Sequence, residues 1–320
     1  MPKMDFKRDL GCEIVRYFDE RSISFEREQS SDTPWLLERY FRLRLKEIAP
    51  RPRRVHHSTE LRAKLGAVEE RYRLPFTEIE QRFEIGSDVS EFQSRLASNV
   101  SVPDAMLNDL GLHHLHLGAK RSPDAKRVER SDMLLLVMVC PDDAYFVDIR
   151  PHPQSSDPDD YGWSQQEYLR LIDRNWSHLL DPYELRGVTG SSIPDSGRRA
   201  LQQKNANVAT QIGDRAIAPP GGGMTSSGAN LTHVWMAMKV LWQLEQLEGA
   251  IHADWEGQHQ TFQRAGLDAG LDTELHLVPI KGATLPEILV GPFTGGLLLS
   301  GWTIQIADTG TRLEWGLQWA

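Results

Sequence analysis

The sequence predicts an α+β protein, with a helical N-terminal region, a central antiparallel sheet flanked by helices, and a β-rich C-terminal region. Three observations support this fold class. Apolar residues recur at helical spacing through the first hundred residues. An apolar run at Met133–Cys140 precedes turn residues and a second apolar run, a pattern typical of a β-hairpin. Alternating apolar and polar residues return from Leu275 to Ala320.

The helical region is expected to cover residues 1–100. Thr33 suits the N-cap of a helix, and Pro50 and Pro52 would end that helix, because proline cannot donate a backbone hydrogen bond inside it. Ser58 or Thr59 can cap the next helix. The buried stripe of the first of these helices is expected to comprise Trp35, Leu36, Tyr40, Leu43 and Ile48.

The sheet is predicted to form in the central region, residues 101–185. Leu112–Leu117 alternates as a strand does, and Met133–Cys140 is apolar on both faces, as in a central strand. Turn residues follow, and Ala144–Ile149 returns as the second arm of the hairpin. Trp163–Leu180 then has the spacing of an amphipathic helix.

Residues 186–320 predict a C-terminal α+β region with a glycine-rich loop, Gly221–Gly228. A small hairpin is expected around Gly213, and a strong helix over Thr232–Glu248. We expect one apolar stripe of this helix to face the core, formed by Val234, Met238, Leu241, Trp242 and Leu244.

Composition limits the functional class. The chain has 320 residues, 40% of them hydrophobic, and a net charge of −9, which argues against a generally basic nucleic-acid binder. Cys12 and Cys140 form no metal-binding CxxC pair. The N-terminus lacks a signal-peptide core, and the longest apolar run is too short to span a bilayer. We therefore expect a cytoplasmic protein without a membrane partner.

The strand Leu112–Leu117 carries the most informative side chains. Residues two apart on a strand point to one side, so His114 and His116 share a face and His113 lies on the other. Paired imidazoles can serve as acid and base near neutral pH. They could also hold a metal, but no carboxylate or cysteine completes a ligand set by spacing. We assign no metal and expect no cofactor.

Basic residues and a further histidine complete the candidate site. Lys120, Arg121 and Arg130 follow the histidine strand, and guanidinium groups suit phosphate oxygens. His152 lies just past the end of the hairpin, where catalytic groups often gather. A second basic block, which includes Arg53 and Arg54, could guide an RNA backbone, although a solvated helix end is the better single explanation.

The glycine-rich loop offers a different kind of site. Gly222, Gly223 and Ser226 precede a helix, where backbone N–H groups favour an anion. The segment lacks both the P-loop and the dinucleotide-binding motif. A structural turn is therefore the preferred interpretation of this segment.

A family resemblance rests on several short segments. They are Pro50-Arg51-Pro52-Arg53, Leu112-His113-His114-Leu115-His116-Leu117-Gly118, Arg130-Ser131-Asp132, Asp143-Ala144-Tyr145-Phe146, Asn175-Trp176 and Pro220-Gly221-Gly222-Gly223. Together they resemble an uncharacterised bacterial family of mobile-element and defence type. The resemblance spans about Arg51–Glu248 and implies kinship more than activity.

The order of elements in the central region is similar to the sheet of RelE-like toxins and of barnase-, EndoU- and colicin-like ribonucleases. Such enzymes cleave RNA without a metal ion. The resemblance implies His114 or His116 as the base, Arg121 or Arg130 as the phosphate clamp, and His152 as an acid. This chain differs from these compact nucleases in its long flanks.

The sequence leaves three functional hypotheses. The first is a metal-independent ribonuclease or toxin-like effector, for example in phage defence, with RNA as substrate and an antitoxin or other protein as partner. The second is a non-enzymatic protein that binds a ligand through Gly221–Gly228 and a partner through its C-terminal β region. The third is a structural or mobile-element component, favoured if the histidines are buried and fully hydrogen-bonded.

Overall fold

The computed structural model describes residues 2–118, 128, 131–153, 162, 165–190, 192–264, 273–279, 285, 302–306 and 312–313. The chain forms two compact units. Unit 1 combines Met1–Phe41 with His233–Ala320, and unit 2 is Arg42–Thr232. These limits differ from the expected divisions near residues 100 and 185, because strand pairing within unit 1 joins the two ends of the chain, a long-range contact that periodicity cannot reveal.

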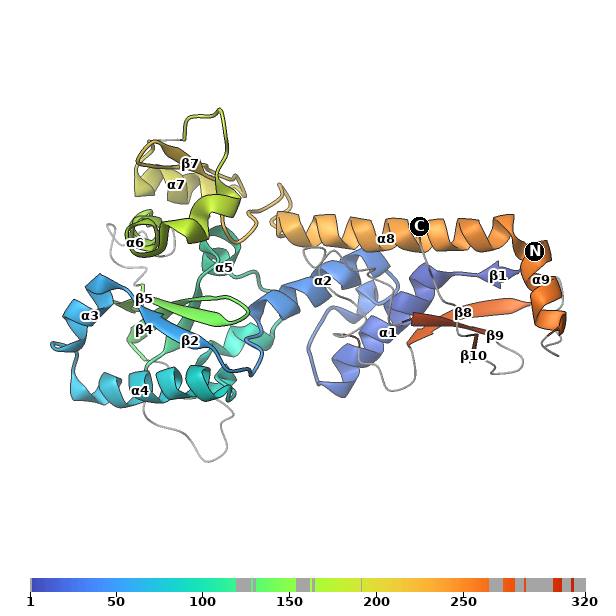
Figure 1. The fold of residues 1–320 in the computed structure, drawn as a ribbon, viewed down its shortest axis with the longest axis horizontal. Helices are drawn as coiled ribbons and strands as arrows, with labels where there is room; N and C mark the ends of the chain where they lie inside the picture. Colours follow the sequence, from blue (N-terminus) through green and yellow to red (C-terminus); the bar gives the residue numbers. More distant parts are fainter. Residues whose placement is uncertain are drawn as a thin grey trace. The chain divides into compact units, whose positions relative to one another are not determined.

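Unit 2 is built on a four-stranded sheet in the order β2-β5-β4-β3 (Figure 1). The strand β4 pairs antiparallel with β3 and with β5, as the hairpin pattern predicted. The α+β class is confirmed. The strands are β2 (Arg54–His57), β3 (His113–His116), β4 (Met133–Val139) and β5 (Asp143–Pro151).

The sheet is mixed, and the sequence predicted an antiparallel one. β2 pairs parallel with β5, with Arg54 opposite Asp143 and His57 opposite Phe146. The segment was interpreted as the end of a helix because Pro50 and Pro52 precede it. Only four residues long, β2 shows too little alternation to predict a strand, and its partner lies about ninety residues further along the chain.

Helices cover both faces of this sheet (Figure 1). Leu135 and Val137 of β4 pack with α3 and α4, while Leu134 and Leu136 pack with α6. Alternate side chains of a strand therefore enter two separate cores. The helices are α3 (Thr59–Leu65), capped by Ser58 as expected, α4 (Glu70–Ile85) and α6 (Glu167–Trp176), which continues into a 3-10 helix, η5 (Ser177–Tyr183).

Short segments surround the outer strand β3. Lys46, at the end of α2, is buried, and its ammonium donates to the carbonyls of Leu96, Asn99 and Val102. A buried ammonium needs such acceptors, so Lys46 fixes the path of the chain between β3 and α2. The segments are α2 (Thr33–Lys46), η2 (Ser90–Phe92), η3 (Arg95–Ser98) and α5 (Ala105–Leu110).

The start of α2 differs from the expected cap. Asp32 accepts a hydrogen bond from the backbone N–H of Trp35 (2.9 Å), which is the contact of an N-cap residue. Thr33, the predicted cap, instead donates its hydroxyl to the Lys7 carbonyl (2.9 Å).

The remainder of unit 2 contains α7 (Asp195–Gln202) and the small hairpin predicted at Gly213, β6 (Thr210–Ile212) with β7 (Arg215–Ile217). The glycine-rich loop lies against the backbone of α5. A Cβ atom on Gly221 would lie 1.8 Å from the Leu107 carbonyl oxygen. Glycine is therefore required at 221 by the close approach of two backbones.

Gly221→Ala is expected to destabilise the protein by several kcal/mol, because the new methyl group must push two backbone segments apart. Chemical denaturation followed by circular dichroism measures this loss. Gly66→Ala is the matched control, since nothing lies within 4 Å of its Cβ position. A Gly221→Ala protein as stable as the Gly66→Ala protein would show that the loop is not packed in this way.

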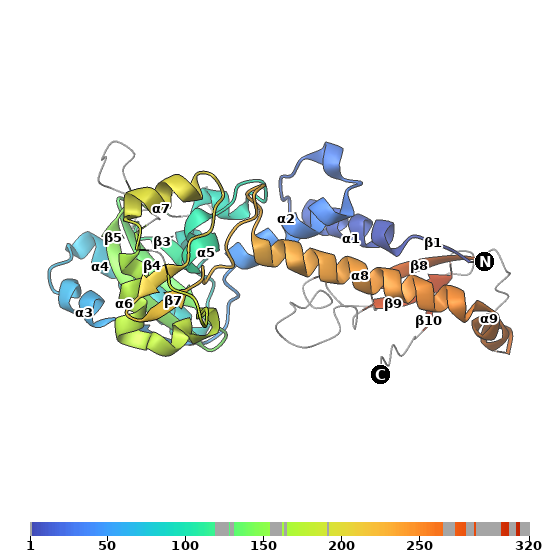
Figure 2. The same ribbon diagram turned by 90° about the horizontal axis from the view of Figure 1, so that it is seen from above.

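Unit 1 contains a second sheet, in the order β1-β8-β9-β10. β1 pairs parallel with β8, so the N-terminus contributes to the sheet that was predicted from the C-terminal pattern alone. Figure 2 shows α8 running alongside α1. The elements are β1 (Lys3–Met4), α1 (Phe6–Glu20), η1 (Arg27–Gln29), α8 (Leu231–Ala253), α9 (Trp255–Arg264), β8 (Glu274–Pro279), β9 (Trp302–Ile306) and β10 (Arg312–Leu313).

The helix predicted over Thr232–Glu248 is present as α8 but extends five residues further, to Ala253, and the prediction was wrong for two side chains. Its buried stripe is formed by His233, Ala237, Val240, Leu244, Leu247 and Ile251. Met238 and Trp242, predicted in the core, are exposed. Within the described ranges, no helix has both the length and the apolar character needed to cross a membrane.

Candidate functional site

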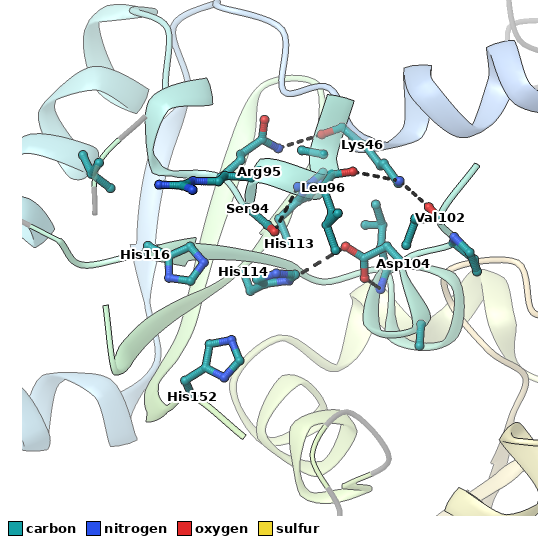
Figure 3. A pocket seen from close by; sticks show the side chains of 16 residues that line it. Lys46, Ser94, Arg95, Leu96, Val102, Asp104, His113, His114, His116 and His152 are labelled. Atoms are coloured by element: carbon teal, nitrogen blue, oxygen red, sulfur yellow. Dashed lines mark hydrogen bonds and ion pairs between the residues drawn. The ribbon is translucent and has the colours of Figure 1, made fainter. Parts of the chain in front are cut away.

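A pocket of about 580 Å³ lies in unit 2 beside the outer strand β3 (Figure 3). Side chains from both faces of β3 line it, so the pocket follows the edge of the sheet. η3 and the start of α5 form its other wall. The lining includes Arg95, Asp104, His113, His114, His116 and His152.

Three histidines gather in this pocket (Figure 3). The ring of His116 stacks against that of His152, with centroids 5.9 Å apart and planes at 17°. It meets the ring of His114 edge-on, at 6.2 Å and 77°. The ring of His116 thus contacts both of the others, and the predicted sharing of one strand face by His114 and His116 agrees with this geometry.

Backbone contacts define the proton positions on two of these rings. The amide of Ser131 donates to Nδ1 of His116 (3.3 Å), so the neutral ring carries its proton on Nε2. Nδ1 of His152 donates to the Pro153 carbonyl (3.1 Å), which leaves the lone pair of the neutral ring on Nε2. His116 is therefore suited to donate a hydrogen bond from Nε2, and His152 to accept a proton there.

His114 lies beside a carboxylate. Its Nδ1 is 3.9 Å from Oδ2 of Asp104, beyond hydrogen-bonding distance but close enough for the carboxylate to attract the protonated ring. The other oxygen, Oδ1, accepts from the Leu107 amide (3.0 Å) and caps α5. The helix therefore fixes the position of the charge that faces His114.

His113 differs from its neighbours. Burial lowers the pKa of His113 to about 4, and the nearby Asp104 carboxylate offsets only part of this effect. The ring is thus neutral at pH 7, and it serves as a wall of the pocket rather than as a cation.

This pKa predicts acid sensitivity. Because the folded-state pKa lies below the ordinary value, His113 contributes stability at neutral pH, and this contribution disappears as the pH falls from about 6.5 toward 4. The loss is on the order of 2–3 kcal/mol. Urea denaturation at pH 7 and pH 4 should show a smaller pH effect in His113→Gln than in the natural protein. Exposed His178→Gln is the control, and equal pH effects in all three proteins would contradict the assignment.

Two pocket residues were missed by the sequence analysis. Arg95 is exposed on η3, and no carboxylate among the described residues pairs with its guanidinium. In Figure 3 its side chain extends to the side of the pocket where His116 lies. Asp104 was missed because the sequence analysis predicted no helix over residues 105–110 for it to cap; the available signal was an acidic residue nine positions before His113.

The other basic residues of the sequence prediction are not brought to the histidines by the described structure. Arg53 is buried and donates to the carbonyls of Ala49, Arg51 and Cys140, which is a structural role. Arg54 lies on the opposite outer strand, β2, and pairs with both oxygens of Asp143 (2.9 and 3.0 Å). Lys120, Arg121 and Arg130 lie outside the described residues.

The glycine-rich loop uses its polar groups within the fold. The amides of Gly222 and Gly223 donate to the carbonyls of Pro219 (3.0 Å) and Asn108 (2.9 Å). Ser226 is exposed, and its carbonyl accepts from Asn205. None of these residues lines the histidine pocket. The arrangement favours the structural-turn interpretation over an anion site.

Among the residues with a described position, no group of three or more His, Cys, Asp or Glu side chains is arranged to hold a metal ion. No family model, curated protein or solved structure matches this chain. The chemistry of the pocket is therefore the remaining guide to function.

Proposed function

We propose that the histidine pocket of unit 2 is the active site of a metal-independent ribonuclease. The observation that carries the proposal is the cluster of three imidazoles, in which the ring of His116 contacts those of His114 and His152 and the contacts of each ring differ. Imidazoles exchange protons near neutral pH, which phosphodiester transfer requires of its acid and base.

The contacts suggest a role for each ring. Nε2 of His152 takes the proton from a ribose 2′-hydroxyl, and the 2′-oxygen forms a bond to phosphorus. The bond from phosphorus to the 5′-oxygen breaks, and protonated His114 gives its proton to that oxygen. Nε2–H of His116 donates to a phosphoryl oxygen between them. The products are a 2′,3′-cyclic phosphate and a 5′-hydroxyl end.

These roles reverse the assignment that the resemblance implied. There His152 was the acid, and His114 or His116 the base. The carbonyl of Pro153 on Nδ1 of His152 favours the base role, since Nδ1 keeps its proton in both states of the ring. Asp104 beside His114 favours the acid role, since a carboxylate stabilises the imidazolium.

Arg95 brings a guanidinium to the pocket, whose lining also includes Lys46. A guanidinium can bind two phosphate oxygens at once and stabilise the charge of the phosphorane. We propose Arg95 for the clamp role that the sequence gave to Arg121 or Arg130. A toxin-like effector that acts in phage defence remains the cellular role we propose, with an antitoxin-like protein as its partner.

The experiment is incubation of the purified full chain with single-stranded RNA in EDTA, with mass spectrometry of the fragments. Fragments that end in 2′,3′-cyclic phosphate and begin with 5′-hydroxyl would support the proposal. Intact RNA, or cleavage that needs a divalent cation, would overturn it.

The alternative is a non-enzymatic protein that binds an anionic ligand through Gly221–Gly228. It receives less support, because the amides of Gly222 and Gly223 already donate to carbonyls of the chain. The third hypothesis is favoured if the histidines are buried and fully hydrogen-bonded. His116 is buried (6% exposed), whereas His114 and His152 are partly exposed and line the pocket.

A further inference from the structure

Three large apolar side chains are exposed on the part of α8 that belongs to unit 1, and Leu231, at the start of the helix, is 49% exposed as well. Trp235, Met238 and Trp242 are 51%, 63% and 58% exposed. Tryptophan and methionine are usually covered in folded proteins, and adjacent exposed ones mark a contact surface. We call these three residues the α8 stripe.

The spacing of the α8 stripe is that of a helix–helix seam. Its residues are three and four positions apart, so they form one row along the helix. The buried residues of α8 follow the same spacing on the opposite side, where Val240 and Leu244 pack in the core. The helix therefore has two apolar faces, and the described residues of unit 1 pack against one of them.

We propose that the α8 stripe binds a second copy of this chain, with the two α8 helices antiparallel. The order Trp-Met-Trp is nearly symmetric about Met238. A two-fold axis there would place Trp235 of each copy against Trp242 of the other, which is the self-complementary arrangement that a symmetric dimer needs.

The charge beside the α8 stripe and the area that the stripe exposes are both consistent with binding of a second copy of the chain. Lys239 is the single charged residue between Leu231 and Leu244, and its ammonium lies 5.6 Å from the centre of the Trp235 ring. In the dimer, the Trp242 indole of the second copy lies against Trp235 and can also contact the Lys239 ammonium. The stripe exposes about 400 Å² per copy, so two copies with their flanking residues bury about 1,000 Å², at the lower limit for a specific interface. We therefore expect a dimer with a micromolar dissociation constant.

Sedimentation velocity of the full chain from 1 to 200 µM tests the proposal. The natural protein should shift from monomer to dimer, and Met238→Glu should stay monomeric at every concentration, because it places two carboxylates at the two-fold axis. Ala250→Glu is the matched control, since it adds the same charge at an exposed position of α8 outside the stripe and should still form dimers.

Circular dichroism will show whether each variant keeps its helix content, and Trp242→Ala provides a second, uncharged test. A natural protein that is monomeric at 200 µM would overturn the proposal. So would a dimer that survives both Met238→Glu and Trp242→Ala, because the contact would then lie elsewhere. Neither outcome bears on the ribonuclease proposal, which concerns unit 2.

Discussion

Replacing His152 by alanine is expected to reduce kcat/KM for RNA cleavage by about 10²- to 10⁴-fold, the usual contribution of a general base. The Nε2 atom of this ring is the proposed proton acceptor, and Pro153 fixes its orientation. His114→Ala should cause a similar loss through the missing acid. His116→Ala removes a hydrogen-bond donor to the phosphate, which is worth about 10²- to 10³-fold.

Two comparisons make this result specific. His252→Ala, at an exposed histidine of unit 1, should keep full activity. Thermal unfolding of each variant will separate loss of chemistry from loss of fold. If all three pocket variants are folded and cleave RNA at the natural rate, the pocket is not the active site.

Replacing Arg198 by methionine is expected to destabilise the protein by about 3–5 kcal/mol, the cost of removing one partner of a buried ion pair. Arg198 is 1% exposed and donates from Nη2 to Oδ2 of Asp109 (2.6 Å). It also donates to the Thr210 hydroxyl, and Gln202 donates to the same carboxylate. These bonds connect α5, α7 and β6, so the variant leaves a buried carboxylate with too few donors.

The pH dependence of stability provides a second test of the Arg198→Met prediction. Burial raises the pKa of Asp109, so its charged form is disfavoured in the folded protein. The damage from Arg198→Met should therefore be largest at neutral pH and smaller in acid, where the carboxyl group is protonated. Urea denaturation at pH 7 and pH 5 measures both values.

Two further variants complete the test of the ion pair. Asp109→Leu combined with Arg198→Met should recover much of the stability, because no unpaired charge remains. Arg54→Met, which breaks the exposed pair with Asp143, should change stability little. Equal effects of Arg198→Met and Arg54→Met would contradict the structural role of the buried pair.

The elements that the sequence predicted well are those with a long local pattern. The hairpin of β4 and β5 was predicted within one or two residues at most ends, because Met133–Cys140 and Ala144–Ile149 flank a turn of proline and aspartates. β3 was predicted from the alternating pattern of Leu112–Leu117. The exposed face of α8 was missed because both sides of this helix carry apolar residues at helical spacing. The spacing alone does not show which side packs in the core.

The candidate site was predicted in part. His114, His116 and His152 were chosen from strand geometry, and the structure brings them together. Arg53 and Arg54 were chosen for charge, but local sequence cannot show that Cys140 and Asp143 already bind them. Asp104 and Arg95 reach the pocket from segments that pack against β3, and such contacts depend on tertiary structure.

The pH dependence of kcat/KM in EDTA tests the central claim most directly. The natural protein should give a bell-shaped profile, because His152 must be neutral and His114 protonated for cleavage. His152→Ala should lose the acidic limb, and His114→Ala the alkaline limb. A profile that keeps both limbs in both variants, or a folded protein with no metal-free cleavage at any pH, would contradict an acid–base role for these histidines.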